Sequence, residues 1–168
     1  MRLFVAIPFS REFRAALLAA QEDLRTQGAR ANYTRPENLH LTLAFIGETE
    51  RYAAAEEAVA QVEAWAFPLR LADGGHFGQL YWAGLDQSAP LEKLAERVQG
   101  SLRAAGFAVE RKPFRPHVTL ARQLSAPGPV QVHPEPAEMT ADRMCLMCSE
   151  RVNGRLVHTP LYEKPLGA

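Results

Sequence analysis

His40-Leu41-Thr42-Leu43 and His117-Val118-Thr119-Leu120 share one pattern of residue types, His, apolar, Thr, apolar, and each continues into Ala. In a β-strand successive side chains point to opposite faces, so His and Thr share one face and the apolar pair the other. Such a strand lines a wet cleft with its back on a core. Five His and seven Thr placed at random in 168 residues give about 0.2 His-x-Thr triplets, so the matched pair is a strong signal.

The segments before the two His stretches follow the same order of expected elements. Before the first, periodicity predicts a buried strand, a helix with Ser10 as N-cap, and a turn-rich segment. Before the second, it predicts a strand, a helix that begins near Pro90, a short strand and a turn. The expected elements are 2–8, 10–28, 29–38 and the His strand 39–46, then 77–85, 90–106, 107–111 and the His strand 117–122. This repetition indicates an internal duplication, which would make the two His strands neighbours.

Between the two halves, Thr49 is the expected N-cap of a further helix. Its apolar stripe would be Tyr52, Val59, Val62 and Trp65. A strand is expected at 67–73, and Gly74-Gly75 would form the turn that follows it.

The C-terminal part contains a proline-rich loop, 125–136, and two expected strands, 138–149 and 155–163. Asn153-Gly154 between strand-like runs is a strong hairpin signal. The fold class is therefore α+β with mostly antiparallel sheet. We expect one domain, 1–168, made of two related lobes with approximate repeats 1–75 and 76–168.

Composition limits the possible functions. The net charge is zero, which argues against a broad electrostatic contact with duplex nucleic acid but allows a compact substrate with one or two phosphates. Cys145 and Cys148 form a C-x-x-C motif, but a second pair of zinc ligands and a redox-type helix start are both missing, so we expect buried thiols in a strand. No apolar run is long enough for a signal peptide or a membrane span, which predicts a cytoplasmic protein.

Two imidazoles and two hydroxyls that face one small volume suit a particular chemistry. Histidine titrates near neutral pH, so one ring can accept a proton while the other donates one. This pairing fits in-line displacement at phosphorus without a metal or cofactor: one His deprotonates the attacking water and the other protonates the departing oxygen. The hydroxyls would hold the non-bridging oxygens. The residue types alone do not show which His takes which role.

HLTLAFIGE (40–48) and PHVTLAR (116–122), together with the N-terminal RLFVAIP (2–8), closely resemble the paired HxTx motifs of the two-histidine (2H) phosphoesterases. Within that superfamily the chain is similar to RNA 2′,3′-cyclic phosphodiesterases, once named 2′-5′ RNA ligases. The resemblance extends over nearly the whole chain, including YWAGL (81–85) and the segment that begins at Ser149.

The resemblance implies a bilobal fold, with two pseudo-symmetric halves whose antiparallel sheets face a central cleft and whose helices lie outside. It implies metal-independent hydrolysis of a terminal 2′,3′-cyclic phosphate to a 2′-phosphate, with RNA ends or nucleoside 2′,3′-cyclic phosphates as substrates. By the same resemblance, His40 is the proton donor, His117 is the proton acceptor, and Thr42 and Thr119 bind phosphate. We expect a monomer without an obligate protein partner.

Other candidate residues carry weaker signals. Arg122 matches the arginine that ends the second motif of the family and would contact phosphate or ribose, but strict alternation from His117 places it on the opposite face, so a twist or bulge is required. Otherwise it forms a surface ion pair. The aromatic residues that could stack on a terminal base, or else belong to the core, are Phe9, Tyr33 and Trp82. The remaining histidines, His76, His133 and His158, are expected to be structural or exposed.

Two alternative functions use the same residues. The first is 2′-5′ joining of RNA, in which an RNA hydroxyl replaces water. Because water is present at about 55 M, we expect at most a weak side activity. The second is a binding module that captures cyclic-phosphate or nucleotide ends without turnover. It is less favoured because phosphate binding alone is usually served by Arg, Lys or backbone amides.

Overall fold

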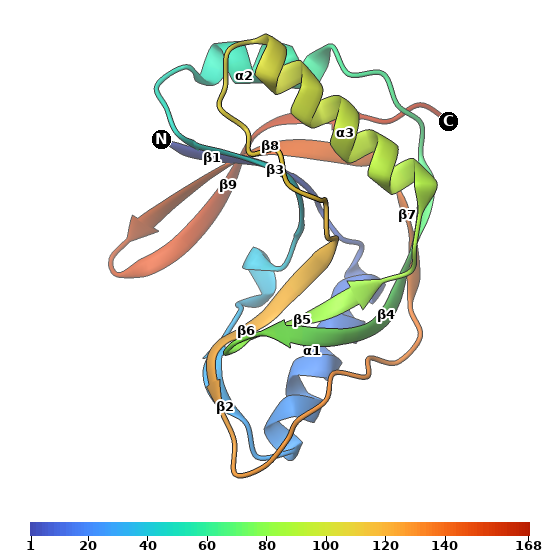
Figure 1. The fold of residues 1–168 in the computed structure, drawn as a ribbon, viewed down its shortest axis with the longest axis vertical. Coiled ribbons are helices and arrows are strands. Elements are labelled where there is room, and N and C mark those ends of the chain that lie inside the picture. Colours follow the sequence, from blue (N-terminus) through green and yellow to red (C-terminus); the bar gives the residue numbers. More distant parts are fainter.

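Two antiparallel β-sheets and three α-helices make up the fold (Figure 1), as seen in a computed structural model that describes residues 1–168. The four-stranded sheet has the order β3 (Leu41–Glu48), β1 (Arg2–Ile7), β8 (Arg143–Val152) and β9 (Arg155–Pro165). The five-stranded sheet has the order β2 (Arg30–Tyr33), β6 (His117–Ser125), β5 (Leu80–Leu85), β4 (Phe67–Phe77) and β7 (Glu138–Ala141). The helices are α1 (Arg11–Thr26), α2 (Tyr52–Ala60), α3 (Ala89–Ala104) and the short 3₁₀-helix η1 (Pro36–Asn38). The expected α+β class with antiparallel sheets is confirmed.

The two long helices are exchanged between the sheets. α1 follows β1 of the four-stranded sheet along the chain, yet it packs against β6 and β7 of the five-stranded sheet. α3 follows β5 of the five-stranded sheet, yet it packs against β3. In Figure 1, α1 lies with the lower sheet, and α2 and α3 lie over the upper one. Each long helix therefore covers the His strand of the other half of the chain, and one core joins helices and sheets.

The ends of α1 and α3 are specified in the same way. The Ser10 hydroxyl accepts a hydrogen bond from the Phe13 amide, and the Ser88 hydroxyl accepts one from the Leu91 amide, each at 3.2 Å. Gly28 and Gly106 follow the two helices with φ values of +90° and +93°, a conformation that glycine adopts without steric cost. The apolar face of α1 is buried through Phe13, Leu17, Ala20 and Leu24, and that of α3 through Leu91, Leu94, Ala95, Val98 and Leu102. The two helices agree with the expected ranges 10–28 and 90–106 to within two residues at each end.

The turn of the C-terminal hairpin is as expected, but the expected strand 138–149 is two strands, β7 in the five-stranded sheet and β8 in the four-stranded sheet. Asn153 and Gly154 connect β8 to β9 and have φ values of +53° and +79°. Positive φ at both central residues is the geometry that matches the twist of two flanking strands. The hairpin formed by β8 and β9 extends beyond the rest of the molecule in Figure 1.

The expected secondary structure of two segments, 30–33 and 107–111, is wrong. Residues 30–33, expected within a turn-rich segment, form β2 and pair with β6. Residues 107–111, expected as a strand, form no strand. In that segment Arg103 of α3 donates hydrogen bonds to the carbonyl oxygens of Val109 and Glu110, so a side chain replaces the neighbouring strand as their partner.

Gly74-Gly75 does not form a turn. Both glycines lie inside β4, and the chain reverses at Gly78-Gln79. A Cβ atom on Gly74 would lie 1.8 Å from the Trp82 carbonyl oxygen, and one on Gly75 would lie 2.9 Å from the Trp82 ring. The two glycines therefore serve the close approach of β5 at an irregularity in the strand pairing.

The second helix also differs from expectation. Its N-cap is Arg51, not Thr49, and the helix ends at Ala60, before two of the four residues of the expected stripe. The Thr49 hydroxyl instead accepts a hydrogen bond from the Arg51 amide in the preceding turn. Val59 and Val62 are buried as expected, but Tyr52 and Trp65 are exposed. The buried face of α2 is made mainly by alanines, whose small side chains let the helix lie close to α3.

We expect the serine caps of α1 and α3 to stabilise the fold to a similar extent. Ser10→Ala and Ser88→Ala should each lower the free energy of unfolding by about 1 kcal/mol, because each leaves an amide at the helix start without its acceptor. Urea denaturation measures this difference. Ser125→Ala, at an exposed position without a side-chain hydrogen bond, is the control and should change stability by at most about 0.5 kcal/mol.

Candidate active site

The two His strands belong to different sheets and approach each other. Residues of β3 and β6 come within 8 Å of one another between Cα atoms. In both stretches the apolar residues are fully buried and the His and Thr are half-buried, as alternation predicts: Leu41, Leu43, Val118 and Leu120 lie inside, and His40, Thr42, His117 and Thr119 lie on the opposite faces. β3 begins at Leu41, two residues after the expected start of the strand at residue 39. His40 therefore immediately precedes β3.

The two imidazoles are anchored by equivalent hydrogen bonds. Nδ1 of His40 lies 2.6 Å from the Asn38 carbonyl oxygen, and Nδ1 of His117 lies 2.7 Å from the Arg115 carbonyl oxygen. A carbonyl only accepts, so Nδ1 carries the proton and donates it in both rings. Each bond reaches the residue two positions earlier in the chain. The arrangement leaves Nε2 of both rings free for proton transfer.

His40 lies in a cluster of three rings. The centroid of its ring is 4.8 Å from that of Phe4 and 5.0 Å from that of His158, and the last two are 4.9 Å apart. His158 comes from β9 and was expected to be structural or exposed, so its position beside His40 was not foreseen. No motif signalled it, because β9 reaches β3 only through two intervening strands. The Nδ1 atom of His158 is buried and has no hydrogen-bond partner.

Burial lowers the pKa of His40 from its ordinary 6.5 to about 4. The hydrogen bond to the Asn38 carbonyl acts in the opposite direction, and positive charge at His158, Arg122 or His117 lowers the pKa further. Two of these residues belong to β6, so the charges of one sheet act on the imidazole of the other. In the free protein at neutral pH, His40 is therefore uncharged.

His117 has different neighbours. Its ring meets Phe77 edge to face at 5.5 Å between centroids and lies 6.1 Å from the ring of Trp82. In the strand pairing His117 lies opposite Gly84, where a Cβ atom would lie 2.3 Å from the Asp73 carbonyl oxygen of β4, so the glycine serves the close approach of β4. Thr119 lies opposite Trp82. The second motif thus has Phe77 and Trp82 as its aromatic neighbours, and the first has Phe4.

Both His strands contain a β-bulge at the last residue of the motif. Ala6 pairs with Thr42 and Val5 with Ala44, so Leu43 is the extra residue in β3. Trp82 pairs with Thr119 and Tyr81 with Ala121, so Leu120 is the extra residue in β6. A bulge inserts one residue and restarts the alternation one position later.

The bulge changes which residue shares the face of the motif. In β6, Leu120 and Ala121 are both buried, and Arg122 returns to the exposed face with His117 and Thr119. This is the bulge that Arg122 required in order to face the site. In β3 the equivalent residue is Phe45, whose side chain is 68% exposed. Its apolar ring would have been assigned to the core from strict alternation alone.

The three aromatic candidates differ in availability. Phe9 is buried in the core and packs on Phe13, so its ring offers no stacking surface to a base. Tyr33 is engaged on one face by the guanidinium of Arg25, 4.1 Å from the ring centroid, and its hydroxyl donates to the Ala29 carbonyl. Trp82 is half-buried beside His117 and stays a candidate for base stacking.

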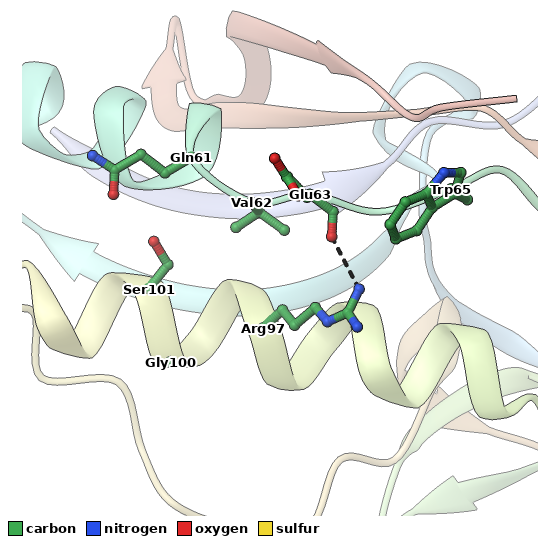
Figure 2. A pocket seen from close by; sticks show the side chains of 7 residues that line it. All are labelled: Gln61, Val62, Glu63, Trp65, Arg97, Gly100 and Ser101. Carbon is green, nitrogen blue, oxygen red and sulfur yellow. Dashed lines mark hydrogen bonds between the residues drawn. The ribbon is translucent and has the colours of Figure 1, made fainter.

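A surface hollow lies elsewhere. It is formed between the end of α2 and the middle of α3 (Figure 2) and is lined by Gln61, Val62, Glu63, Trp65, Arg97, Gly100 and Ser101. Arg97 donates a hydrogen bond to the Glu63 carbonyl oxygen across it at 3.0 Å. None of the candidate site residues lines this hollow, so it has no part in the chemistry inferred above.

Other features expected from the sequence have plain structural roles. Cys145 and Cys148 are free, buried thiols in β8, as expected, and burial raises the pKa of each. No group of three or more His, Cys, Asp or Glu is arranged to hold a metal ion. None of the helices has the length and apolar character needed to cross a membrane.

Comparison with known proteins gives consistent matches. Residues 13–153 match the model of the 2′-5′ RNA ligase superfamily. An RNA 2′,3′-cyclic phosphodiesterase of Thermotoga maritima is 29% identical over 97% of this chain and 94% of its own length. One from Escherichia coli is 30% identical over 95% and 93%. One from Geobacillus stearothermophilus is 32% identical over 95% of this chain, which spans only 54% of that relative.

Solved structures agree with these matches. E. coli LigT in its apo form has a TM-score of 0.84 with 28% identity and covers 99% of this chain and 98% of its own. LigT complexed with 3′-AMP has a TM-score of 0.84 with 29% identity over 98% and 97%. TT0787 of Thermus thermophilus has a TM-score of 0.79 with 32% identity over 99% and 98%.

We expect His40 to stay uncharged until the pH falls to about 4. Because the unfolded chain takes up this proton near pH 6.5, His40 should make the folded state less stable as the pH falls from 6.5 to about 4. An NMR titration of the imidazole carbon shifts measures the pKa directly, with His40→Asn to assign the signal. Titration of the His40 signal near 6.5 in the folded protein would contradict the inferred burial.

Proposed function

The chain belongs to the 2′-5′ RNA ligase superfamily, and from this membership we propose that it hydrolyses RNA 2′,3′-cyclic phosphodiester ends to 2′-phosphomonoesters by acid–base catalysis with His40 and His117. One observation carries the proposal. The two imidazoles come from different sheets, each is anchored through Nδ1 to a carbonyl two residues upstream, and each keeps Nε2 free. A pair of opposed proton carriers is what displacement at phosphorus requires.

The proposed step is an in-line attack of water on the cyclic phosphate. Nε2 of His117 accepts a proton from the attacking water while the new P–O bond forms. The bond between phosphorus and O3′ breaks, and His40 donates a proton from Nε2 to O3′. The product carries a 2′-phosphate and a 3′-hydroxyl. The donor and acceptor roles follow the resemblance of the two motifs to those of the two-histidine phosphoesterases, since both rings are anchored alike.

The donor role places a requirement on His40. An imidazole with a pKa of about 4 is uncharged in the free protein at neutral pH and has no proton on Nε2 to give. The negative charge of a bound cyclic phosphate favours the protonated ring and would raise this pKa. His40 would thus become a competent acid only when substrate is present, which limits loss of the proton to water.

The remaining polar residues would hold the phosphate. The hydroxyls of Thr42 and Thr119 lie on the faces of their strands that carry the two histidines, and Arg122 joins that face beyond the bulge in β6. These groups would bind the non-bridging oxygens and stabilise the charge that develops in the transition state. Trp82, beside His117, would support the terminal base.

The substrates follow from the relatives. The curated relatives are named for action on RNA 2′,3′-cyclic phosphate, and E. coli LigT has been crystallised with 3′-AMP. We propose that RNA ends and nucleoside 2′,3′-cyclic phosphates are both substrates, and that 2′-5′ joining is a weak side reaction. The proposed chemistry uses no metal or cofactor, and we place the enzyme in the cytoplasm as a monomer.

The central test is the loss of activity in histidine variants. We expect His40→Ala and His117→Ala each to lower kcat by about 10²–10⁴, because each removes one proton-transfer role. The assay uses an oligonucleotide that ends in a 2′,3′-cyclic phosphate, in the presence of EDTA, and identifies the product as a 2′- or 3′-phosphate. His76→Ala, on the exposed end of β4, is the matched control and should retain full activity.

A substrate analogue separates the two histidine roles. If sulfur replaces the bridging O3′, the leaving group departs as a thiolate and needs no proton. We expect this analogue to restore much of the rate of His40→Ala relative to wild type and to leave His117→Ala impaired. Rescue of His117→Ala instead would reverse the assigned roles.

The same variants distinguish an enzyme from a binding module. A receptor for cyclic-phosphate ends would bind the oligonucleotide without forming product, and His117→Ala would then have no turnover to lose. Saturable binding by the wild-type protein without any opening of the cyclic ester, under conditions in which a control phosphodiesterase opens it, overturns the proposed function.

A further inference from the structure

We propose that Gln21 of α1 and Gln99 of α3 are positioning residues, which hold the bulges of the two His strands. Through the bulges they place Arg122 of β6 and Phe45 of β3 on the face of the site. The inference rests on the proposed function, because it concerns residues that would contact the substrate. It depends on hydrogen bonds to the backbone of the two extra residues, Leu120 and Leu43.

A bulge leaves backbone groups outside the regular ladder, and buried carbonyl oxygens need other partners. In β6 the carbonyl oxygen of the extra residue Leu120 accepts a hydrogen bond from Nε2 of Gln21 at 2.9 Å. It accepts a second one from the Thr34 amide, also at 2.9 Å. The Thr34 hydroxyl donates to the carbonyl of Thr119 at 2.9 Å. The backbone of the bulge is thus held by donors of two residues, Gln21 and Thr34.

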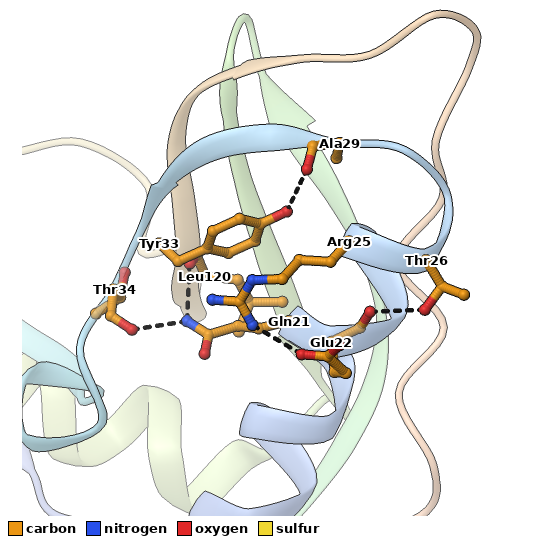
Figure 3. A network of polar contacts seen from close by, with 8 residues as sticks. All are labelled: Gln21, Glu22, Arg25, Thr26, Ala29, Tyr33, Thr34 and Leu120. Carbon is orange, nitrogen blue, oxygen red and sulfur yellow. Dashed lines mark hydrogen bonds and ion pairs between the residues drawn. The ribbon is translucent and has the colours of Figure 1, made fainter.

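Gln21 is well placed for this role. Its side chain is 2% exposed, and Nε2 also donates to the Thr34 carbonyl oxygen at 2.8 Å. Figure 3 shows the amide of Gln21 between Thr34 and Leu120, and it also draws Arg25 and Tyr33, whose guanidinium and ring stack on each other. Burial of an amide costs free energy unless its hydrogen bonds are made. Because Nε2 of Gln21 uses both of its hydrogens as donors, we attribute a specific role to this side chain.

The first motif has an equivalent hydrogen bond from a helix glutamine. Nε2 of Gln99 donates to the carbonyl oxygen of Leu43, the extra residue of β3, at 2.9 Å. Gln21 and Gln99 each lie eleven residues after the serine that caps their helix. Two unrelated glutamines would not be expected at the same helix position, each bonded to the extra residue of a His strand. The repetition therefore points to a constraint that both motifs share.

Because the two helices are exchanged between the sheets, each of these hydrogen bonds joins a His strand to the other half of the chain. Gln21 comes from the helix that follows β1 but binds β6, and Gln99 comes from the helix that follows β5 but binds β3. Each motif is therefore held by a helix of the opposite half of the chain. Without the amide, the bulge in β6 keeps only the Thr34 amide as a partner at Leu120. Arg122, which lies beyond the bulge, should then lose its fixed position, whereas Thr119 stays paired opposite Trp82.

The experiment is a double-mutant cycle between Gln21 and Arg122. We expect Gln21→Leu, a change of similar size without donors, to lower kcat/KM for the cyclic-phosphate oligonucleotide by about tenfold. Arg122→Ala should lower it by about 10²-fold. If Gln21 acts through Arg122, Gln21→Leu should cost about twofold or less in the Arg122→Ala background. A full tenfold loss in that background shows a merely structural role and overturns the inference.

Gln27→Leu is the matched control. Gln27 lies just after the same helix, and its amide donates to the carbonyl of Gln131 in the proline-rich loop, away from both motifs. This variant removes the hydrogen bonds that the amide donates to Gln131 and Asp23 and the one that it accepts from the Gln131 amide, and it should leave kcat/KM unchanged. Circular dichroism and thermal unfolding establish that each variant is folded. Should Gln21→Leu fail to fold, Thr34→Val, which removes the bond to the Thr119 carbonyl, is submitted to the same cycle with the same expectation.

A binding measurement separates this inference from the proposed function. The Nε–H signal of Arg122 in a ¹H–¹⁵N spectrum should shift on titration with inorganic phosphate, and Gln21→Leu should weaken that response about tenfold while Gln27→Leu preserves it. If Gln21→Leu weakens the phosphate response of Arg122 but the wild-type protein opens no cyclic ester, the proposed function fails and the positioning role stands. If the ester is opened and the response of Gln21→Leu equals that of wild type, the positioning role fails alone.

Discussion

The exchange of α1 and α3 between the two sheets holds the candidate site together. An amphipathic helix must bury its apolar face, and each of these helices does so against the sheet from which it did not emerge. Burial of a large side chain such as Phe13 or Leu17 contributes about 1.5–3 kcal/mol, compared with about 1 kcal/mol for a helix cap. The sheets therefore cannot separate without exposing several such side chains. As a result residues of β3 and β6 stay within 8 Å between Cα atoms, and the charge of His117 acts on the pKa of His40.

Within this frame, two nearly identical motifs have different surroundings. His40 is enclosed by Phe4 and His158, and burial lowers its pKa to about 4. His117 lies beside Phe77 and Trp82 and opposite a glycine. Different environments are the usual means by which equal residue types take opposite roles in acid–base catalysis. The two matched motifs supply two imidazoles with the same anchoring, but the asymmetry between them comes from β9 and from the hairpin of β4 and β5.

Local signals in the sequence predicted the elements that depend on a few neighbouring residues. Ser10 and Gly28 mark the ends of α1, and Asn153-Gly154 marks the last hairpin, because capping and turn geometry involve only adjacent backbone. Prediction failed where a distant partner decides the conformation. Gly74-Gly75 has the composition of a turn but lies within a strand, where Trp82 approaches too closely for a side chain. Residues 30–33 become a strand because β6 offers an edge, and 107–111 do not because Arg103 takes their carbonyl groups.

The sequence by itself determined the class of the fold, the repeated order of expected elements and the four polar residues of the two motifs. Alternation of residue types and the spacing of the motifs can be recognised from the sequence alone. Tertiary structure alone decided that Arg122 and Phe45 share the face of the histidines and that His158 joins His40. These outcomes depend on bulges and on contacts between strands that are distant along the chain. A bulge shifts the alternation by one residue, and no local pattern of residue types records that shift.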